Sequence, residues 1–185
     1  MTVSRCAWAN TSKLLTKYHD EEWGDPIYDD QKLFEILILE SQSCGLSWEL
    51  ILRKSDHMKN VFDNFDPKIM ITYSEAKIDA FMQDTGVIRN RLKLKSLPEN
   101  AKAYLKLKET GSLSDFLWGY VNHKTIINDG KEYITKSKIS EKMNKDLKKL
   151  GFKFLGSTIL YSFMQVIGLV DDHADYCFKK RQPTS

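Results

Sequence analysis

The chain has 185 residues, 42% hydrophobic and 29% charged, a composition typical of a folded globular domain. No apolar run approaches the roughly eighteen residues of a membrane span, and the first residues lack the apolar segment of a secretory signal. Three cysteines, an odd number, argue against a disulfide framework, so we expect a cytoplasmic protein. The net charge of +3 suits a polyanionic partner but does not require one.

The first predicted helices follow the N-terminal segment. The stretch "DDQKLFEILILESQSCG" (29–45) opens with an aspartate cap and carries a broad apolar face. The stretch "SWELILRKS" (47–55) begins at a serine. In "DPKIMITYSEAKIDAFMQDTG" (66–86) two helix starts are expected, at Pro67 and Ser74.

Helical patterns continue through the second half. The segment 90–111 repeats apolar residues every three to four positions, with a break expected near Pro98, and 112–122 is amphipathic. The highly charged segment 137–151 reads as a helix that ends at its terminal glycine. The nearly all-apolar segment 156–170 is expected to form a central buried helix.

Convincing strand patterns are missing. A short patch, "KTIINDGKEYIT" (124–135), is either a strand or a loop. The chain shows no internal repeat, low-complexity stretch or linker. We therefore predict an all-α fold that forms a single compact unit over residues 1–185.

A histidine and a cysteine lie four residues apart in "DDHADYCFKK" (171–180). Placed one helical turn apart, His173 and Cys177 can chelate one ion. Cys6 and His19 would complete a Cys2His2 set, which suits Zn²⁺. The alternative is that these side chains are ordinary core or surface residues, and the spacing alone leaves both readings open.

A helical hairpin is predicted in "LKKLGFKFLGSTILYSFMQ" (147–165). One helix stops at Gly151 and the next opens at Gly156, where free amides and nearby lysines form an anion site for a phosphate. The bare pattern favours an ordinary hairpin. Beyond it, Asp171 and Asp172 are candidates to face the sugar of a bound nucleotide, or to orient a metal-ligating histidine.

An acid and several aromatic residues suggest a pocket. Glu40 lies in an otherwise apolar helix, where an unpaired carboxylate is costly. Trp8, Tyr18, Trp23 and Trp48 supply flat faces that suit a cationic heterocycle. Composition alone favours the other reading, in which the aromatic residues are core and the glutamate lies at a helix edge.

Several blocks in this order resemble one family. They are "YHDEEWG" (18–24), "LFEILILESQSCGLSW" (33–48), "FLWGYVN" (116–122), "GFKFLGSTILYSFMQVIGLVDDH" (151–173) and the terminal cysteine at 177. Over nearly the whole chain the sequence is similar to the 3-methyladenine DNA glycosylase I family of the helix-hairpin-helix superfamily. The resemblance implies a helix-hairpin-helix glycosylase-like helical bundle.

The resemblance also implies the sites. A structural zinc would join residues 1–25 to 165–180 through the ligands Cys6, His19, His173 and Cys177. Residues 141–165 would form the helix-hairpin-helix element that contacts DNA through Lys153, Gly156 and Ser157. In the pocket, Glu40 would read the base, Tyr18 and Trp48 would stack on it, and Trp8 would line it.

The implied activity is base excision repair. The enzyme would flip 3-methyladenine out of double-stranded alkylated DNA and hydrolyse its glycosidic bond, leaving an abasic site. The segment 156–165 has no lysine for a Schiff base, so we expect a monofunctional glycosylase without strand cleavage. We also expect a monomer. The alternative is a catalytically inactive, zinc-stapled module that binds damaged DNA.

Four positions invite attention. Leu15, Ser43 and Cys44 stand where family members often carry tyrosine, glutamine and alanine, so the pocket shape would differ. We further hypothesise that Asp171 stabilises the oxocarbenium charge that develops on the sugar, although it precedes a metal-ligand candidate by only two residues.

Overall fold

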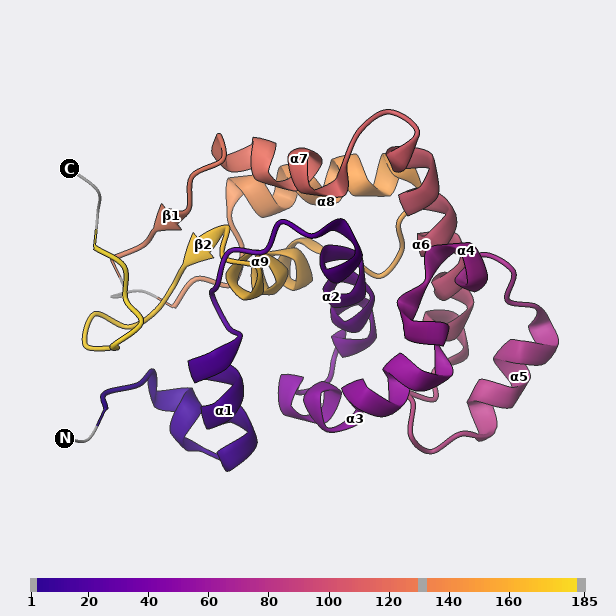
Figure 1. The fold of residues 1–185 in the computed structure, drawn as a ribbon, viewed down its shortest axis with the longest axis horizontal. Helices are drawn as coiled ribbons and strands as arrows, with labels where there is room; N and C mark the ends of the chain where they lie inside the picture. Colours follow the sequence, from indigo (N-terminus) through magenta and orange to yellow (C-terminus); the bar gives the residue numbers. More distant parts are fainter. Residues whose placement is uncertain (1–2, 130–132, 183–185) are drawn as a thin grey trace.

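The computed structural model describes residues 3–129 and 133–182, which are mostly helical (Figure 1). Three short 3-10 helices are Ala7–Asn10, Asp63–Phe65 and Gly119–Val121. The α-helices are α1 Lys13–Glu21, α2 Asp30–Ser43, α3 Trp48–Val61, α4 Pro67–Met70, α5 Glu75–Gln83, α6 Arg91–Lys108, α7 Leu113–Trp118, α8 Lys138–Leu150 and α9 Ser157–Val166. The strands are β1 Ile126–Ile127 and β2 Val170–Asp171.

Helix α2 is the centre of the core. It packs against α9, α3, α6 and α7, and Figure 1 shows α2 and α9 in the middle of the molecule. Leu33, Phe34, Leu37 and Ile38 are fully buried. Helix α2 needs the broad apolar face that its sequence shows, because it contacts neighbouring helices on several sides. None of the helices in the described part of the chain is long and apolar enough to cross a membrane.

The predicted helix starts are confirmed. Side chains of Asp29, Ser47 and Ser74 cap α2, α3 and α5 by accepting backbone N–H groups three residues on. At the other end, Gly151 ends α8 with φ 103°, a left-handed conformation that glycine adopts without strain. Local chemistry in the sequence therefore sets most of the helix boundaries.

The predicted break at Pro98 is wrong. Helix α6 runs through it without interruption. Leu94, Leu97 and Ala101 are fully buried on either side of the proline, in a helix that packs against α2 and α4. The burial of these neighbours outweighs the one backbone hydrogen bond that proline removes.

The predicted patch 124–135, of which residues 130–132 lie outside the described residues, contributes a two-residue strand, β1. β1 pairs with β2 in parallel, Ile126 opposite Val170 and Ile127 opposite Asp171. Apart from this two-residue pairing, the described chain is helical and turn structure, as predicted. The pairing holds the chain after α7 against the C-terminal tail.

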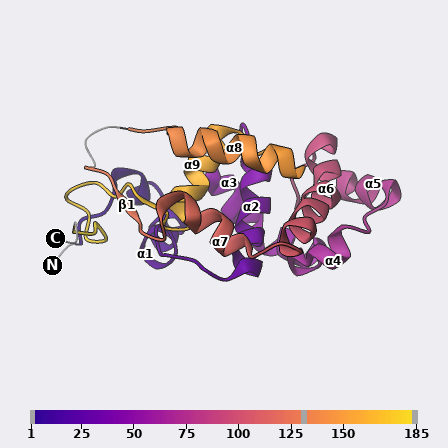
Figure 2. The same cartoon turned by 90° about the horizontal axis from the view of Figure 1, so that it is seen from above.

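The tail is not helical, contrary to expectation. Helix α9 ends at Val166, short of residue 170, and residues 172–180 are irregular chain with turns at 175–176 and 178–179. Gly168 has φ +75°, and a Cβ there would lie 2.8 Å from the Pro26 nitrogen, so only glycine fits. The tail then reaches the N-terminal segment, where Phe178 N–H donates to Ser4 C=O at 2.9 Å. Both termini consequently lie at one end of the molecule (Figure 2).

Candidate active site

A pocket of about 460 Å³ lies among α1, the start of α3 and α9. Its wall is predominantly aromatic and aliphatic, with a few polar groups, as is usual for a site that binds a small flat molecule. The lining residues are Trp8, Leu15, Tyr18, Trp23, Ser47, Trp48, Glu49, Tyr133, Ile134, Ser162, Gln165, Val166 and Asp172.

Three of the predicted pocket residues form one aromatic wall. The rings of Tyr18 and Trp48 lie 5.9 Å apart at 47°, and those of Tyr18 and Trp8 lie 6.4 Å apart at 51°. The hydroxyl of Tyr18 and Nε1 of Trp48 are buried, and neither has a hydrogen-bond partner within residues 3–129 and 133–182. A buried polar group left unpaired costs about 1–3 kcal/mol. A bound ligand with matching polar atoms would remove that cost.

Glu40 lies behind this pocket rather than in its lining. It is only 1% exposed. Its Oε1 accepts from Ser162 Oγ at 2.9 Å and its Oε2 from Ser43 Oγ at 3.1 Å. Burial raises the pKa of Glu40 to about 8, against the lowering effect of the two serines. Ser162 itself lines the pocket, so Glu40 adjoins the cavity through this hydroxyl.

A cysteine–histidine cluster lies beside the pocket. One ligand atom from each of Cys6, His19 and Cys177 lies within 4.8 Å of the others, and all three residues are buried. Nε2 of His19 is 3.4 Å from Sγ of Cys177. Burial lowers the pKa of His19, which favours the neutral imidazole that binds metals. The cluster is therefore able to hold a metal ion.

His173 stands next to this cluster. Its ring centroid is 5.4 Å from that of His19, and its buried Nε2 has no hydrogen-bond partner among the residues that the structure describes. A carboxylate faces Nδ1 of each ring, Asp20 at His19 and Asp171 at His173, both at 2.8 Å. Carboxylates fix the orientation of metal-ligating histidines in this way. The structure thus groups three of the four predicted ligands; their thiol and imidazole donors suit Zn²⁺, and Nε2 of His173 lies beside them.

The pocket and the cysteine–histidine cluster are built from adjacent residues of the same chain segments. Tyr18 lines the pocket and His19, the next residue, is part of the cluster; likewise Asp172 lines the pocket, and His173, the next residue, lies beside the cluster. Trp8, two residues after Cys6, packs edge-on against Trp23 with centroids 5.1 Å apart. A metal in the cluster would therefore hold the pocket wall as well as the chain ends.

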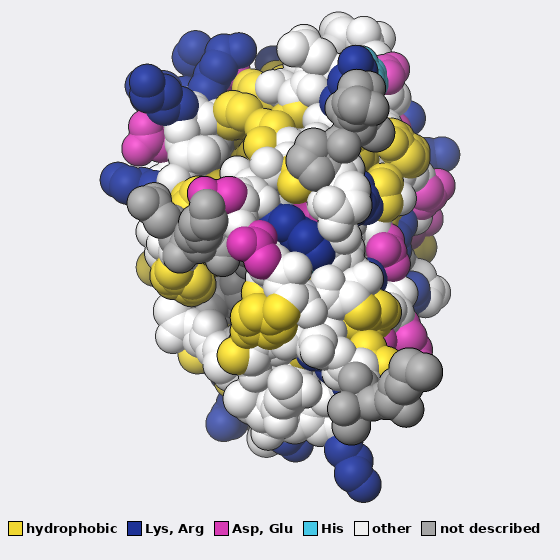
Figure 3. Space-filling view, turned by 90° about the vertical axis from the view of Figure 1, so that its left-hand side faces the viewer, with side chains coloured by type: hydrophobic (Ala, Val, Ile, Leu, Met, Phe, Trp, Pro, Cys, Tyr) yellow, Lys and Arg dark blue, Asp and Glu magenta, His cyan; other side chains and the backbone are white. Residues whose placement is uncertain are grey.

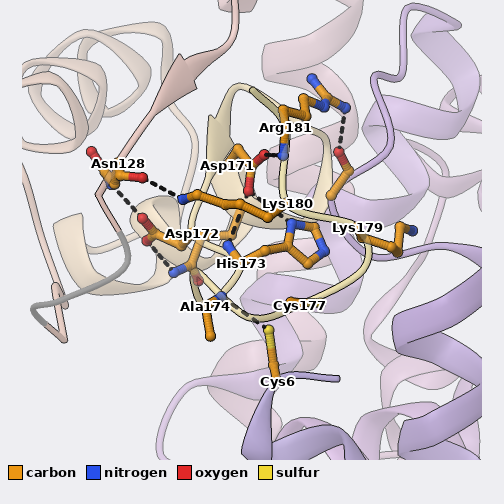
Figure 4. Close-up of polar contacts among 12 residues, drawn as sticks. Cys6, Asn128, Asp171, Asp172, His173, Ala174, Cys177, Lys179, Lys180 and Arg181 are labelled. Atoms are coloured by element: carbon orange, nitrogen blue, oxygen red, sulfur yellow. Dashed lines mark hydrogen bonds and ion pairs between the residues drawn. The ribbon is translucent and has the colours of Figure 1, made fainter. Parts of the chain in front are cut away.

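The two adjacent aspartates of the tail have different surroundings (Figure 4). Asp171 is 1% exposed and does not line the pocket. Its Oδ1 accepts from His173 N–H at 3.0 Å, and its Oδ2 from Arg181 N–H at 2.8 Å. These bonds outweigh burial and hold the pKa of Asp171 below its ordinary value. The structure thus brings Asp171 to the histidine and leaves Asp172 at the pocket.

The predicted hairpin forms between α8 and α9. Lys153 is exposed, and its backbone is pinned to α6 by Asn100, whose Oδ1 accepts from Lys153 N–H at 2.7 Å. Gly156 precedes α9, and no side chain caps the first amides of that helix. Gly156 is exposed and Ser157 half-buried, so these amides are accessible to an anion.

Sequence reasoning missed three supporting residues. Ser162 and Gln165 lie one turn apart on α9 and reach different carboxyl groups, Glu40 and Asp172. Lys93 is buried and donates from Nζ to the carbonyls of Gln42 at 2.8 Å and Cys44 at 2.6 Å. The contacts of Ser162 and Lys93 join elements far apart in the sequence, and that of Gln165 crosses the turn after α9, so helical spacing carries no signal for any of them.

The unusual positions have distinct settings. Leu15 lines the pocket where an aromatic ring was expected in relatives. Ser43 supports the Glu40 carboxyl, whereas Cys44 is exposed beyond the end of α2. The end of the molecule that carries the termini shows basic and acidic side chains intermixed (Figure 3). The net positive charge is therefore not gathered into one patch on that face.

The fold corresponds to that of a known class of helical DNA repair enzyme. The solved structure of 3-methyladenine DNA glycosylase I from Staphylococcus aureus, described as showing 3-methyladenine recognition, superposes with a TM-score of 0.92 at 36% identity. The match covers 97% of this chain and 98% of that one.

Sequence comparison gives the family. The model described as methyladenine glycosylase matches residues 8–180. A DNA-3-methyladenine glycosylase of Haemophilus influenzae is 46% identical, covering 95% of this chain and 97% of that protein. DNA-3-methyladenine glycosylase 1 of Escherichia coli is 41% identical, covering 95% and 96%. The chain belongs to the methyladenine glycosylase family.

Proposed function

We propose that this chain removes 3-methyladenine from alkylated double-stranded DNA by hydrolysis and leaves an abasic site. The observation that carries the proposal is the aromatic pocket of Trp8, Tyr18 and Trp48, with two unpartnered polar atoms in its wall and the Glu40 carboxyl behind it. The family relationship supports the same substrate.

The pocket chemistry suits an alkylated base. Methylation on the ring makes adenine a cation, and stacking between aromatic rings contributes roughly 1–3 kcal/mol per base, with cation–π attraction added. A cation in the pocket favours the ionised form of Glu40, since opposite charges stabilise each other. Neutral adenine gains neither of these electrostatic terms, so the site discriminates by charge.

The same charge explains how little acid catalysis is needed. The methylated base leaves as a neutral molecule, so the chain has only to extrude the nucleotide, bind the base and position water. None of the described residues that line the pocket is a lysine, which supports a monofunctional glycosylase without strand cleavage.

Zn²⁺ bound by Cys6, His19, His173 and Cys177 would supply structural cross-linking and no chemistry, because four protein ligands leave no open position. The chain's own residues do the positioning, with Asp20 and Asp171 orienting the two imidazoles. We assign residues 1–25 and 165–180 to this clasp.

Residues 141–165 are assigned to DNA backbone contact. A phosphate at the start of α9 would accept from the free amides near Gly156 and Ser157, beside the exposed Lys153. The chain would act as a monomer on duplex DNA. Three unpaired thiols suit the reducing cytoplasm as its location.

The test is release of free base from methylated duplex DNA by the purified chain, beside Glu40→Gln. The expected result is release of 3-methyladenine, slower in the variant. Binding of methylated DNA with no base released would instead support a damage-binding module without activity, and it would remove the assigned role of Glu40.

A further inference from the structure

One carboxylate of the pocket has no assigned role. Two residues with carboxylate side chains line the described pocket, Glu49 and Asp172. Glu49 pairs with Arg53 at 2.7 Å, which neutralises its charge. No lysine or arginine pairs with Asp172 within residues 3–129 and 133–182. Asp172 is therefore the negative charge that the described pocket wall presents without compensation.

Neutral donors hold this carboxylate in place. Oδ2 accepts from Tyr161 Oη at 2.7 Å and from Gln165 Nε2 at 2.6 Å, and Oδ1 accepts from the Asn128 amide. Burial and Asp172 raise the pKa of Tyr161, so its phenol remains a donor. Neutral donors stabilise and orient a negative charge without cancelling it. Tyr161 and Gln165 belong to α9, and Asn128, which Figure 4 shows beside Asp172, directly follows β1, so two segments hold the carboxylate.

The position of Asp172 in the pocket suits contact with the sugar of a flipped nucleotide rather than with its base. Ser162 and Gln165 lie one turn apart on α9, and they support Glu40 and Asp172 respectively. Glu40 is buried behind the aromatic wall, whereas Asp172 is partly exposed in the pocket surface. A flipped base enters the aromatic part first, and its deoxyribose stays nearer to solvent because the DNA backbone holds it.

We infer that Asp172 is a catalytic carboxylate that faces C1′ of the flipped nucleotide, an inference that rests on the proposed glycosylase function. The C1′–N bond breaks, and its electron pair goes to the methylated base, which leaves neutral. The negative charge of Asp172 stabilises the oxocarbenium ion that remains. Water then forms the new O–C1′ bond and gives one proton to Asp172, which passes it to solvent.

This assignment differs from the sequence hypothesis for Asp171. The carboxyl oxygens of Asp171 are occupied by His173 and Arg181, away from the pocket. The neighbouring carboxylate of Asp172, by contrast, lines the cavity and is held by Tyr161 and Gln165. Two adjacent residues therefore have different roles: Asp171 orients a histidine, and Asp172 contacts the substrate.

The experiment measures single-turnover excision from methylated duplex DNA with the full chain and Asp172→Asn. We expect the rate to fall by about a hundredfold or more, with affinity for free 3-methyladenine within threefold of wild type. Formate should restore excision to Asp172→Ala by supplying a carboxylate. Asp63→Asn is the matched control, because Asp63 accepts from a tyrosine hydroxyl, that of Tyr73 at 2.7 Å, outside the pocket.

A structural role would give other results. If Asp172→Asn excises within threefold of wild type, or if excision and base affinity fall together, the inference is wrong. Tyr161→Phe keeps the charge and removes one donor, so it should lose about tenfold in rate by disorienting the carboxylate. A rate unchanged in Tyr161→Phe, or no rescue by formate, would also count against it. Absence of base release from wild type would instead overturn the proposed function itself.

Discussion

The Asp171 carboxylate fixes the imidazole of His173: Oδ1 lies 2.8 Å from Nδ1, while the buried Nε2 has no hydrogen-bond partner in the described part of the chain. This arrangement leaves one nitrogen of the ring free for an ion. The carboxylate is itself held by the backbone of Arg181, so the tail after the cluster also supports the ring.

Asp171→Asn should therefore weaken zinc binding by about 10- to 100-fold, because the imidazole loses its charged partner. Metal content after competition with a chelator measures the effect. Excision by the zinc-saturated variant should match wild type. A variant that keeps its zinc but loses excision would revive the hypothesis that Asp171 acts on the sugar directly.

Removing the metal from wild type should loosen the pocket as well as the termini. Tyr18 and Asp172 directly precede His19 and His173, so loss of the ion frees both walls. Chelation should lower the thermal midpoint and weaken binding of free 3-methyladenine together, and zinc should restore both. A pocket that binds the base equally well without metal would contradict this coupling.

Glu40 makes stability depend on pH. Its pKa is about 8 in the folded chain and 4.5 in ordinary surroundings, so between these values only the folded state holds the proton. Stability at this site is then lost as the pH rises from 4.5 to 8, by on the order of 5 kcal/mol. Glu40→Gln should gain free energy of unfolding relative to wild type across that range. Denaturant unfolding of both proteins at several pH values measures this difference in free energy of unfolding. A difference that does not change with pH would contradict the burial of an ionisable group.

Tyr18→Phe should have opposite effects on stability and binding. The Tyr18 hydroxyl is buried without a partner, so its removal should stabilise the free protein by about 1 kcal/mol. Affinity for 3-methyladenine should fall by roughly threefold to tenfold, the worth of one hydrogen bond. Tyr73→Phe is the matched control: its hydroxyl donates to Asp63, so that change should destabilise. Lower stability in both variants would show that Tyr18 has a partner in solution.

Lys93→Met should loosen the loop that leads to Trp48. Lys93 donates to two carbonyls at the end of α2, and its loss should cost about 2–3 kcal/mol. Amide hydrogen exchange at residues 44–47 should accelerate, and the Michaelis constant for methylated DNA should rise. Lys95→Met is the control, because Lys95 forms an exposed ion pair with Glu75. Equal effects of the two substitutions would argue against a specific role for Lys93.

Lys153→Ala should weaken binding of any DNA sequence at low salt. If this lysine neutralises one phosphate, the slope of log affinity against log salt should fall by about 0.9. Fluorescence anisotropy at several salt concentrations gives the slope, and Lys153→Arg should retain it. An unchanged slope in the alanine variant would remove Lys153 from the DNA interface.

Local signals in the sequence predicted much of the fold. Cap residues such as Asp29 and Ser74 marked helix starts, because their side chains satisfy amides within the same turn. The predicted break at Pro98 was wrong, because a helix interior packed on both sides tolerates the one backbone hydrogen bond that proline removes. The predicted helix in the tail was wrong, because the spacing of four between His173 and Cys177 fits a helix and a turn equally well. Only contacts with the N-terminal segment select the turn.

By itself, the sequence determined the helical class, the family resemblance and the residue types from which a pocket and a metal cluster are built. Only the tertiary structure decided which atoms meet: that Ser162 and Ser43 hold Glu40, and that Asp172 rather than Asp171 borders the cavity. The physical reason is the distance along the chain over which each interaction acts. Helix periodicity and capping act over a few residues, whereas burial, pKa and hydrogen-bond partners depend on groups that the folded chain brings together from distant positions.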